Sequence, residues 1–127
     1  MTVPADLDRL DGQFDGVNIK VLKAGGLTPA LAMLRRCRDE GVATMLGCLP
    51  ESSAGASAAA HLAGLAGHVD LDTVALLATD TGDGATLDRY GRLAVPDRPG
   101  TGFVPDPTSP AWIPSARVAD PHVSEHR

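Results

Sequence analysis

Three short apolar stretches along the chain have the composition of buried β-strands, and two helical segments separate them. The apolar stretches are residues 17–22, 42–48 and 69–77, and the second of them shows little polar alternation, as expected for a strand covered on both faces. The segments 28–40 and 53–65 lie between them, and the second of these is rich in alanine. Successive strands are separated by crossovers of about 20 residues, which predicts parallel strands joined by right-handed connections. The pattern therefore predicts an α/β fold in β-α-β-α-β order.

The flanking segments have weaker patterns. Leu7, Leu10 and Phe14 have helical spacing and predict a short helix over residues 5–14. The helix over residues 28–40 is expected to start at Thr28 and Pro29, with the threonine hydroxyl as the cap and proline at the first helical position.

After the third strand, the glycines of "TDTGDGATLDRYGRLAV" predict at most a short β-hairpin. The following chain is rich in proline and has almost no apolar period. We therefore expect one folded unit over residues 1–103 and a disordered Pro-rich tail over residues 104–127.

Composition excludes several classes of function. The net charge is -5, and no basic stripe could follow a phosphate backbone, so nucleic acid is not an expected partner. The start of the chain lacks the basic and apolar regions of a signal peptide, and no apolar run is long enough to span a membrane, so we expect a cytoplasmic protein without a membrane partner. Cys37 and Cys48 are expected to be free thiols, since their spacing is not that of a metal site.

The polar residues with chemical potential lie near the ends of the predicted strands. Asn18 and Lys20 are expected to share one face of the first strand, and Asp70 and Asp72 one face of the third. Ligands of parallel sheets bind at the carboxyl ends of the strands, so these side chains could surround one site. The simpler alternative is a lysine that extends to water from a strand end and a solvated pair of aspartates. The candidate residues are Asn18, Lys20, Glu51, Ser52, Asp70 and Asp72.

Four stretches resemble one family in unbroken order: "DGVNIKVLKAGGLTPALAM", "GVATMLGCLPES", "SAAAHLAGLA" and "VDLDTVALLATD". Together they are similar to the last three barrel strands of the enolase superfamily, in its muconate-lactonizing subgroup and particularly in dipeptide epimerases such as L-Ala-D/L-Glu epimerase. The resemblance covers residues 6–103. It implies a partial (β/α)8 barrel, with the three parallel strands as strands six to eight.

The resemblance also implies roles for the candidate residues. Lys20, in the "NIK" of the sixth strand, would be one of two bases beside the substrate's α-carbon. Asp70 and Asp72 would bind the α-ammonium of a dipeptide. Glu51 and Ser52 would lie near the reacting carboxylate, which the family binds through Mg²⁺, and Asn18 would line the substrate site.

The family's metal ligands and second base belong to strands that would precede residue 6, so this chain is expected to contribute no metal ligand. We therefore expect the C-terminal part of a Mg²⁺-dependent dipeptide epimerase, without turnover on its own. Two alternatives stay open: another muconate-lactonizing reaction (cycloisomerase or o-succinylbenzoate synthase), or a non-catalytic truncated remnant. The expected partners are a small dipeptide and either the missing N-terminal barrel portion or a second copy of the chain.

Overall fold

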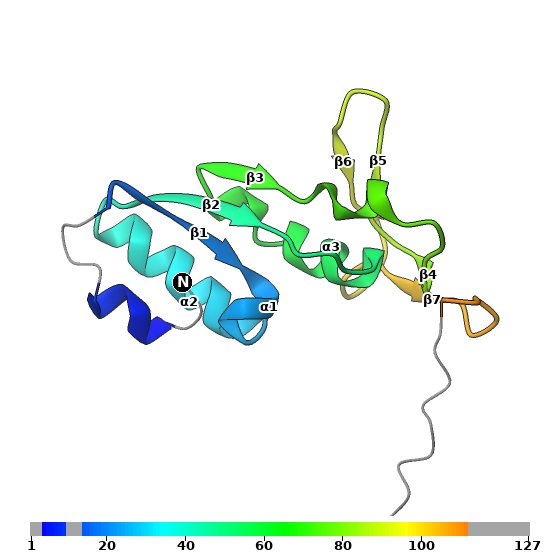
Figure 1. The fold of residues 1–127 in the computed structure, drawn as a ribbon, viewed down its shortest axis with the longest axis horizontal. Helices are drawn as coiled ribbons and strands as arrows, with labels where there is room; N and C mark the ends of the chain where they lie inside the picture. Colours follow the sequence, from blue (N-terminus) through cyan, green and yellow to red (C-terminus); the bar gives the residue numbers. More distant parts are fainter. Residues whose placement is uncertain (1–3, 10–13, 112–127) are drawn as a thin grey trace, which may run out of the picture.

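A three-stranded parallel sheet is the main sheet of the protein in the computed structural model, which describes residues 4–9 and 14–111. The strands β1 (Gly16–Lys20), β2 (Ala43–Gly47) and β3 (His68–Asp70) lie side by side in this order (Figure 1). Both strand pairs are parallel. The predicted parallel β-α-β-α-β order is thus confirmed, whereas the numbering of these strands within a closed barrel stays a prediction.

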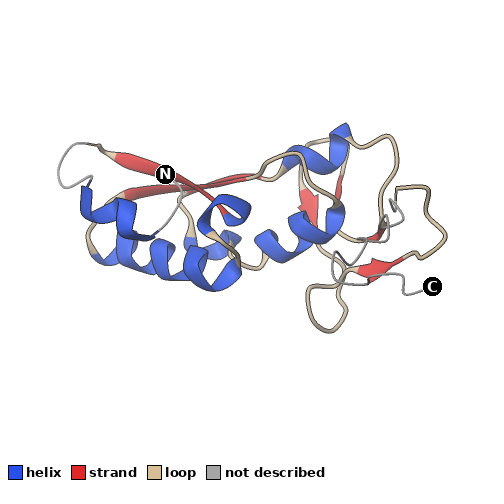
Figure 2. Cartoon of the chain, turned by 60° about the horizontal axis from the view of Figure 1, so that its bottom comes forward, coloured by secondary structure: helices blue, strands red, loops and turns tan. Residues whose placement is uncertain are grey.

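The two faces of the sheet have different surroundings. Ile19 pairs with Leu46 in the register, and both side chains are almost fully buried against the helices. The helices lie on this face of the sheet, as Figure 2 shows. Residues one position further along each strand belong to the opposite face because side chains alternate. That opposite face contains the candidate residues Asn18, Lys20 and Asp70.

The helix α2 (Leu27–Asp39) contributes the largest part of the helical layer. Its buried residues recur at the spacing of a single helix face, as expected for an amphipathic helix packed on a sheet. An ion pair between Arg36 and Asp8, with 2.6 Å between Nη1 and Oδ1, joins α2 to the 3-10 helix η1 (Pro4–Arg9). Of the helix predicted over residues 5–14, the structure has the first part, as η1, and residues 10–13 lie outside the described residues. The buried stripe of α2 consists of Ala30, Met33, Leu34 and Cys37.

The first strand ends two residues earlier than predicted. Val21 and Leu22 belong to a short helix, α1 (Val21–Ala24), and Leu22 is 63% exposed. Gly25 ends α1 with a φ of 94°, which glycine adopts without steric cost. Apolar residues at this position thus mark a turn out of the sheet and not a continuation of the strand.

The start of α2 also differs from the prediction. Its N-cap is Gly26, no side chain caps it, and Pro29 is the third helical residue. Proline is tolerated there because the first turn has no intrahelical acceptor for its missing N–H.

The second crossover and the third strand are shorter than predicted. α3 (Ser53–Ala60) ends before the 3-10 helix η2 (Ala63–Leu65), so the alanine-rich segment is not one helix. β3 ends at Asp70, and the 3-10 helix η3 (Asp72–Leu76) follows. Leu71 leaves the extended conformation with a ψ of 44°, and this turn places its side chain in the core at 4% exposure.

The remaining described chain forms two small antiparallel pairs. The predicted hairpin is present as β5 (Thr86–Leu87) and β6 (Leu93–Ala94), and it projects from the body of the molecule (Figure 1). β4 (Gly82–Asp83) pairs with β7 (Val104–Pro105), so the first residues of the predicted tail lie in a strand and not in disordered chain. Residues 112–127 lie outside the described residues, and their disorder stays a prediction.

In the described part of the chain, no helix combines the length and apolar character needed to cross a bilayer. Cys37 and Cys48 are free, as predicted.

Candidate functional site

Lys20 and Asp70 occupy matching positions at the carboxyl end of the sheet. In the register, Lys20 pairs with Gly47, and Gly47 pairs with Asp70. Residues paired in this way lie on the same face, and neighbouring strands are about 4.8 Å apart, so the two backbones are separated by roughly 10 Å. The middle position is Gly47, so β2 contributes no side chain between them. Lys20 and Asp70 thus lie on one face of the sheet at its carboxyl end, and their part in binding a ligand stays a prediction.

Asn18 lies on the same face and leans across the middle strand. A Cβ added at Gly47 would come 2.6 Å from Asn18 Oδ1, so the amide occupies the space that the glycine leaves. The amide side chain is exposed on the side of the sheet that the helices do not cover. Asn18 therefore extends the polar row of Lys20 and Asp70 along the open face.

Asp72 is not on the third strand, contrary to the prediction that it shares a strand face with Asp70. It is the first residue of η3, since Leu71 turns the chain out of the sheet. Its carboxylate contacts the end of β2, where Cys48 Sγ lies 3.7 Å from Asp72 Oδ1. Burial raises the pKa of the Cys48 thiol, the N–H of Thr73 opposes this, and Asp72 adds to the rise. Asp72 thus lies at the predicted end of the sheet but is held by a turn.

Glu51 and Ser52 lie in the loop between β2 and α3, as the sequence predicts. The backbone N–H of Glu51 donates to Thr73 Oγ1 over 3.0 Å, and the Thr73 hydroxyl donates to the Glu51 carbonyl oxygen over 3.3 Å. The Glu51 carboxylate lies against Gly55, where an added Cβ would overlap Oε2. Burial raises the pKa of Glu51, although the N–H of Leu49 opposes the shift. Ser52 is the N-cap residue of α3, but its side chain makes no capping hydrogen bond.

Two anchoring residues were missed at the sequence level. Thr73 is 1% exposed and binds the backbone of Glu51. Asp80 binds the start of α3, with its two carboxylate oxygens 3.2 and 3.1 Å from the nitrogen of Ser53. Both contacts connect residues more than 20 positions apart, and only the Asp in a predicted turn could have suggested a capping residue. The structure thus places the six candidate residues at one face or end of the sheet, while the role of each stays a prediction.

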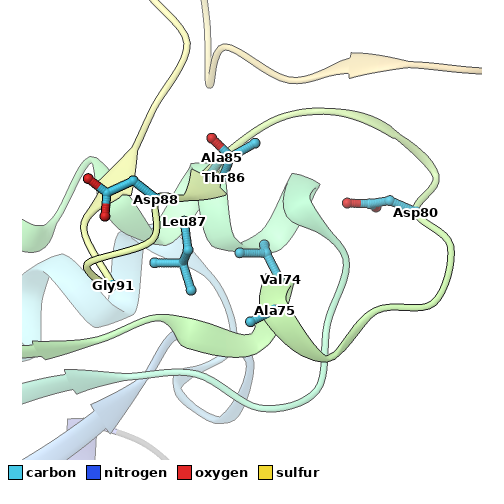
Figure 3. A pocket seen from close by; sticks show the side chains of 8 residues that line it. All are labelled: Val74, Ala75, Asp80, Ala85, Thr86, Leu87, Asp88 and Gly91. Atoms are coloured by element: carbon cyan, nitrogen blue, oxygen red, sulfur yellow. The ribbon is translucent and has the colours of Figure 1, made fainter.

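A cavity of about 490 Å³ lies away from these residues, between η3 and the β5–β6 hairpin (Figure 3). Its lining surface is mostly apolar, and both of its carboxylates already have partners. Asp80 binds Ser53, and Asp88 accepts from the backbone N–H groups of Tyr90 and Arg92 at the hairpin tip. The cavity therefore offers no free charged group for chemistry.

A metal centre does not fit the part of the chain that the structure describes. Within residues 4–9 and 14–111, no three side chains of His, Cys, Asp or Glu are grouped so that they could hold an ion. We therefore assign no step to a metal ion bound by these residues.

Comparison with known proteins identifies the class. The enolase C-terminal domain-like family model matches residues 4–109, and the chain belongs to this family. The family expected from the four sequence stretches is thereby confirmed.

The individual relatives are epimerases. The chain is 39% identical over 100 residues to the L-Ala-D/L-amino acid epimerase of Maribacter sp., covering 79% of this chain and 30% of that protein. The dipeptide epimerase of Methylococcus capsulatus, solved with Mg and L-Arg-D-Lys, superposes with a TM-score of 0.74 at 36% identity, over 82% of this chain and 31% of the other. The dipeptide epimerase of Cytophaga hutchinsonii, solved with Mg and D-Ala-L-Val, superposes with a TM-score of 0.76 at 28% identity. The superposition covers 85% of this chain and 31% of that one. The chain thus spans about 30% of the length of these relatives.

Proposed function

We propose that this chain forms the C-terminal part of a dipeptide epimerase site and supplies one base and the ammonium-binding carboxylates. The observation that carries the proposal is the register row Lys20–Gly47–Asp70, which presents an amine and a carboxylate on one open face. The relatives that bind dipeptides belong to the same family, which supports this reading. The chain spans only part of their length, so the complete reaction needs residues from outside it.

In the proposed reaction, Lys20 in its neutral form accepts the α-proton of the substrate, and the electron pair of the broken C–H bond moves onto the adjacent carboxyl group. A base on the opposite face, supplied from outside this chain, then returns a proton to carbon. Asp70 and Asp72 accept hydrogen bonds from the substrate ammonium, whose three donors suit two carboxylates. Glu51 and Ser52 lie near the substrate's carboxylate, and Asn18 lines the substrate site.

Charge and position support the proposed ammonium-binding role. Asp70 and Asp72 are both exposed, and no ion pair within the described residues engages either carboxylate. Cys48 occupies only one side of the Asp72 carboxylate. The two side chains therefore keep acceptor capacity for a cation.

The test is α-proton exchange in D₂O with L-Ala-L-Glu, followed by ¹H NMR. The 127-residue chain is combined with the part of the Maribacter relative that the match leaves out, about 70% of that protein, since the match covers 30% of it. We expect exchange only in the combination, and we expect Lys20→Met to lower its rate at least about 100-fold, as for loss of a general base. Lys23→Met is the matched control, since Lys23 is exposed in α1 and should leave the rate unchanged. Exchange that survives Lys20→Met within a few-fold of the wild-type rate would show that Lys20 is not the base.

One further variant separates this proposal from the other reactions of the subgroup. Asp72→Asn should raise the KM for a dipeptide, because the ammonium loses a charged partner. Cycloisomerisation of muconate or synthesis of o-succinylbenzoate involves no ammonium, so an enzyme of that kind would be nearly unaffected. A folded chain that supports no α-proton exchange, either alone or in the combination, would instead favour the non-catalytic remnant.

A further inference from the structure

The loop after β2 and the start of η3 are connected by side-chain hydrogen bonds at two neighbouring positions. Thr73 binds both polar backbone groups of Glu51, at 3.0 Å for the N–H and 3.3 Å for the carbonyl oxygen. Beside it, Cys48 Sγ lies 3.7 Å from Asp72 Oδ1. In the proposed function, Glu51 lies at the carboxylate end of the substrate and Asp72 at its ammonium end, so these contacts connect the two ends of the site.

Thr73 is suited to hold the loop firmly. Its side chain is 1% exposed, so water does not compete for the hydroxyl, and the hydroxyl uses both its donor and an acceptor position on one residue. Glu51 itself lies outside any helix or strand, so no strand ladder holds its backbone. Without the hydroxyl, its N–H and carbonyl groups would be left without this partner.

Gly55 completes the arrangement from the other side. Because it has no Cβ, the Glu51 carboxylate can lie directly against α3, where burial raises its pKa. The position of this carboxylate therefore depends on a backbone held by Thr73 and on a space left by Gly55.

We propose that Thr73 is a positioning residue, whose hydroxyl holds Glu51 and Ser52 in fixed relation to Asp72, so that both ends of the substrate site are set by one contact. This inference rests on the proposed function for the meaning of the two ends. The contact itself exists in the absence of substrate and can be measured without turnover.

The experiment uses NMR on the 127-residue chain and compares Thr73→Val with Thr73→Ser. Valine matches the shape of threonine without its hydroxyl, and serine keeps the hydroxyl. We expect the Glu51 amide to exchange with solvent at least about tenfold faster in Thr73→Val, and the Glu51 carboxyl pKa to fall towards its ordinary value. Thr73→Ser should retain both wild-type properties. Thr86→Val, at an exposed position on β5, is the matched control and should change neither.

Two results would overturn the proposal. One is a folded Thr73→Val protein in which the Glu51 amide exchange and carboxyl pKa remain as in the wild type. The other is a Thr73→Ser protein that loses both the Glu51 amide protection and the raised carboxyl pKa, because the methyl group and not the hydroxyl would then hold Glu51. The serine variant tests the proposal even where Thr73→Val does not fold.

Gly55→Ala is a second, independent variant. It should lower the Glu51 pKa by displacing the carboxylate while the Glu51 amide stays protected; loss of that protection would contradict the role of the hydroxyl. In the combined, active form, Thr73→Val should lower kcat/KM for L-Ala-L-Glu about tenfold or more, and Thr73→Ser should restore it. Failure of the wild-type combination to exchange dipeptide protons would refute the proposed function alone, because the NMR readouts need no substrate.

Discussion

Replacing Asp80 with alanine should destabilise the protein through the start of α3. The first N–H groups of a helix have no intrahelical acceptor, and Ser52, the N-cap residue, supplies none from its side chain. Asp80 supplies the acceptor from 27 residues away, and its Oδ1 also accepts from the N–H of Thr81 over 2.7 Å. Loss of a capping side chain costs about 1 kcal/mol, and loss of the second hydrogen bond roughly another 1 kcal/mol. We therefore expect the free energy of unfolding to fall by about 2 kcal/mol.

Urea unfolding followed by circular dichroism can measure this change. With a slope of about 2 kcal/mol per M for a small domain, the midpoint should fall by about 1 M. Asp80→Asn keeps one acceptor oxygen but removes the charge that interacts with the helix dipole, so it should cost only about 0.5–1 kcal/mol. Asp97→Ala is the matched control, because Asp97 is exposed and makes no ion pair or side-chain hydrogen bond with the described residues. An unchanged midpoint in Asp80→Ala would refute the capping role.

Two further predictions concern the site face and its loop. Burial raises the pKa of Glu51, so the folded protein binds more protons than the unfolded chain, and this group lowers stability as the pH rises from the ordinary glutamate pKa through the raised one. Glu51→Gln should therefore stabilise the protein at pH 7 in urea unfolding, and the difference from wild type should vanish below about pH 4; a difference that does not depend on pH would contradict this. Gly47→Ala should displace Asn18, since the added Cβ would come 2.6 Å from Oδ1, and it should shift the Asn18 side-chain amide signals in NMR. Gly64→Ala, where an added Cβ meets nothing within 4 Å, should leave the Asn18 signals in place.

The main helix could be predicted because its apolar positions are periodic, and the strands could be predicted because they are short apolar runs. The stripe of α2 repeats at helical spacing, and Ile19 and Leu46 alternate with residues of the open face. The same rule failed at Val21 and Leu22, which are apolar but helical. The glycines that follow determine the result, since Gly25 adopts a φ of 94° and allows α1 to end within one turn. A pattern of apolar residues does not distinguish the last residues of a strand from the first turn of a helix.

The site could be predicted only in part, for a related reason. Lys20 and Asp70 were placed correctly by alternation along strands. Asp72 was placed on the wrong element, because burial of Leu71 turns the chain before the alternation can continue. Thr73 and Asp80 were missed because they follow β3, whereas their partners, Glu51 and Ser53, lie in the crossover between β2 and β3. No spacing rule along one segment connects such positions.

The site lies where the sheet no longer determines the position of the chain. The strand ladder fixes Lys20 and Asp70, because each pairs in register with Gly47. Beyond the strand ends, long-range polar contacts replace the ladder, and Thr73 is the example that holds Glu51. A substitution in the aliphatic core, such as at Leu46, should change how much of the protein is folded, since the core makes the sheet stable. A substitution at Thr73 should in addition change where Glu51 lies within the folded protein, so the geometry of the site depends on polar contacts that the aliphatic core does not supply.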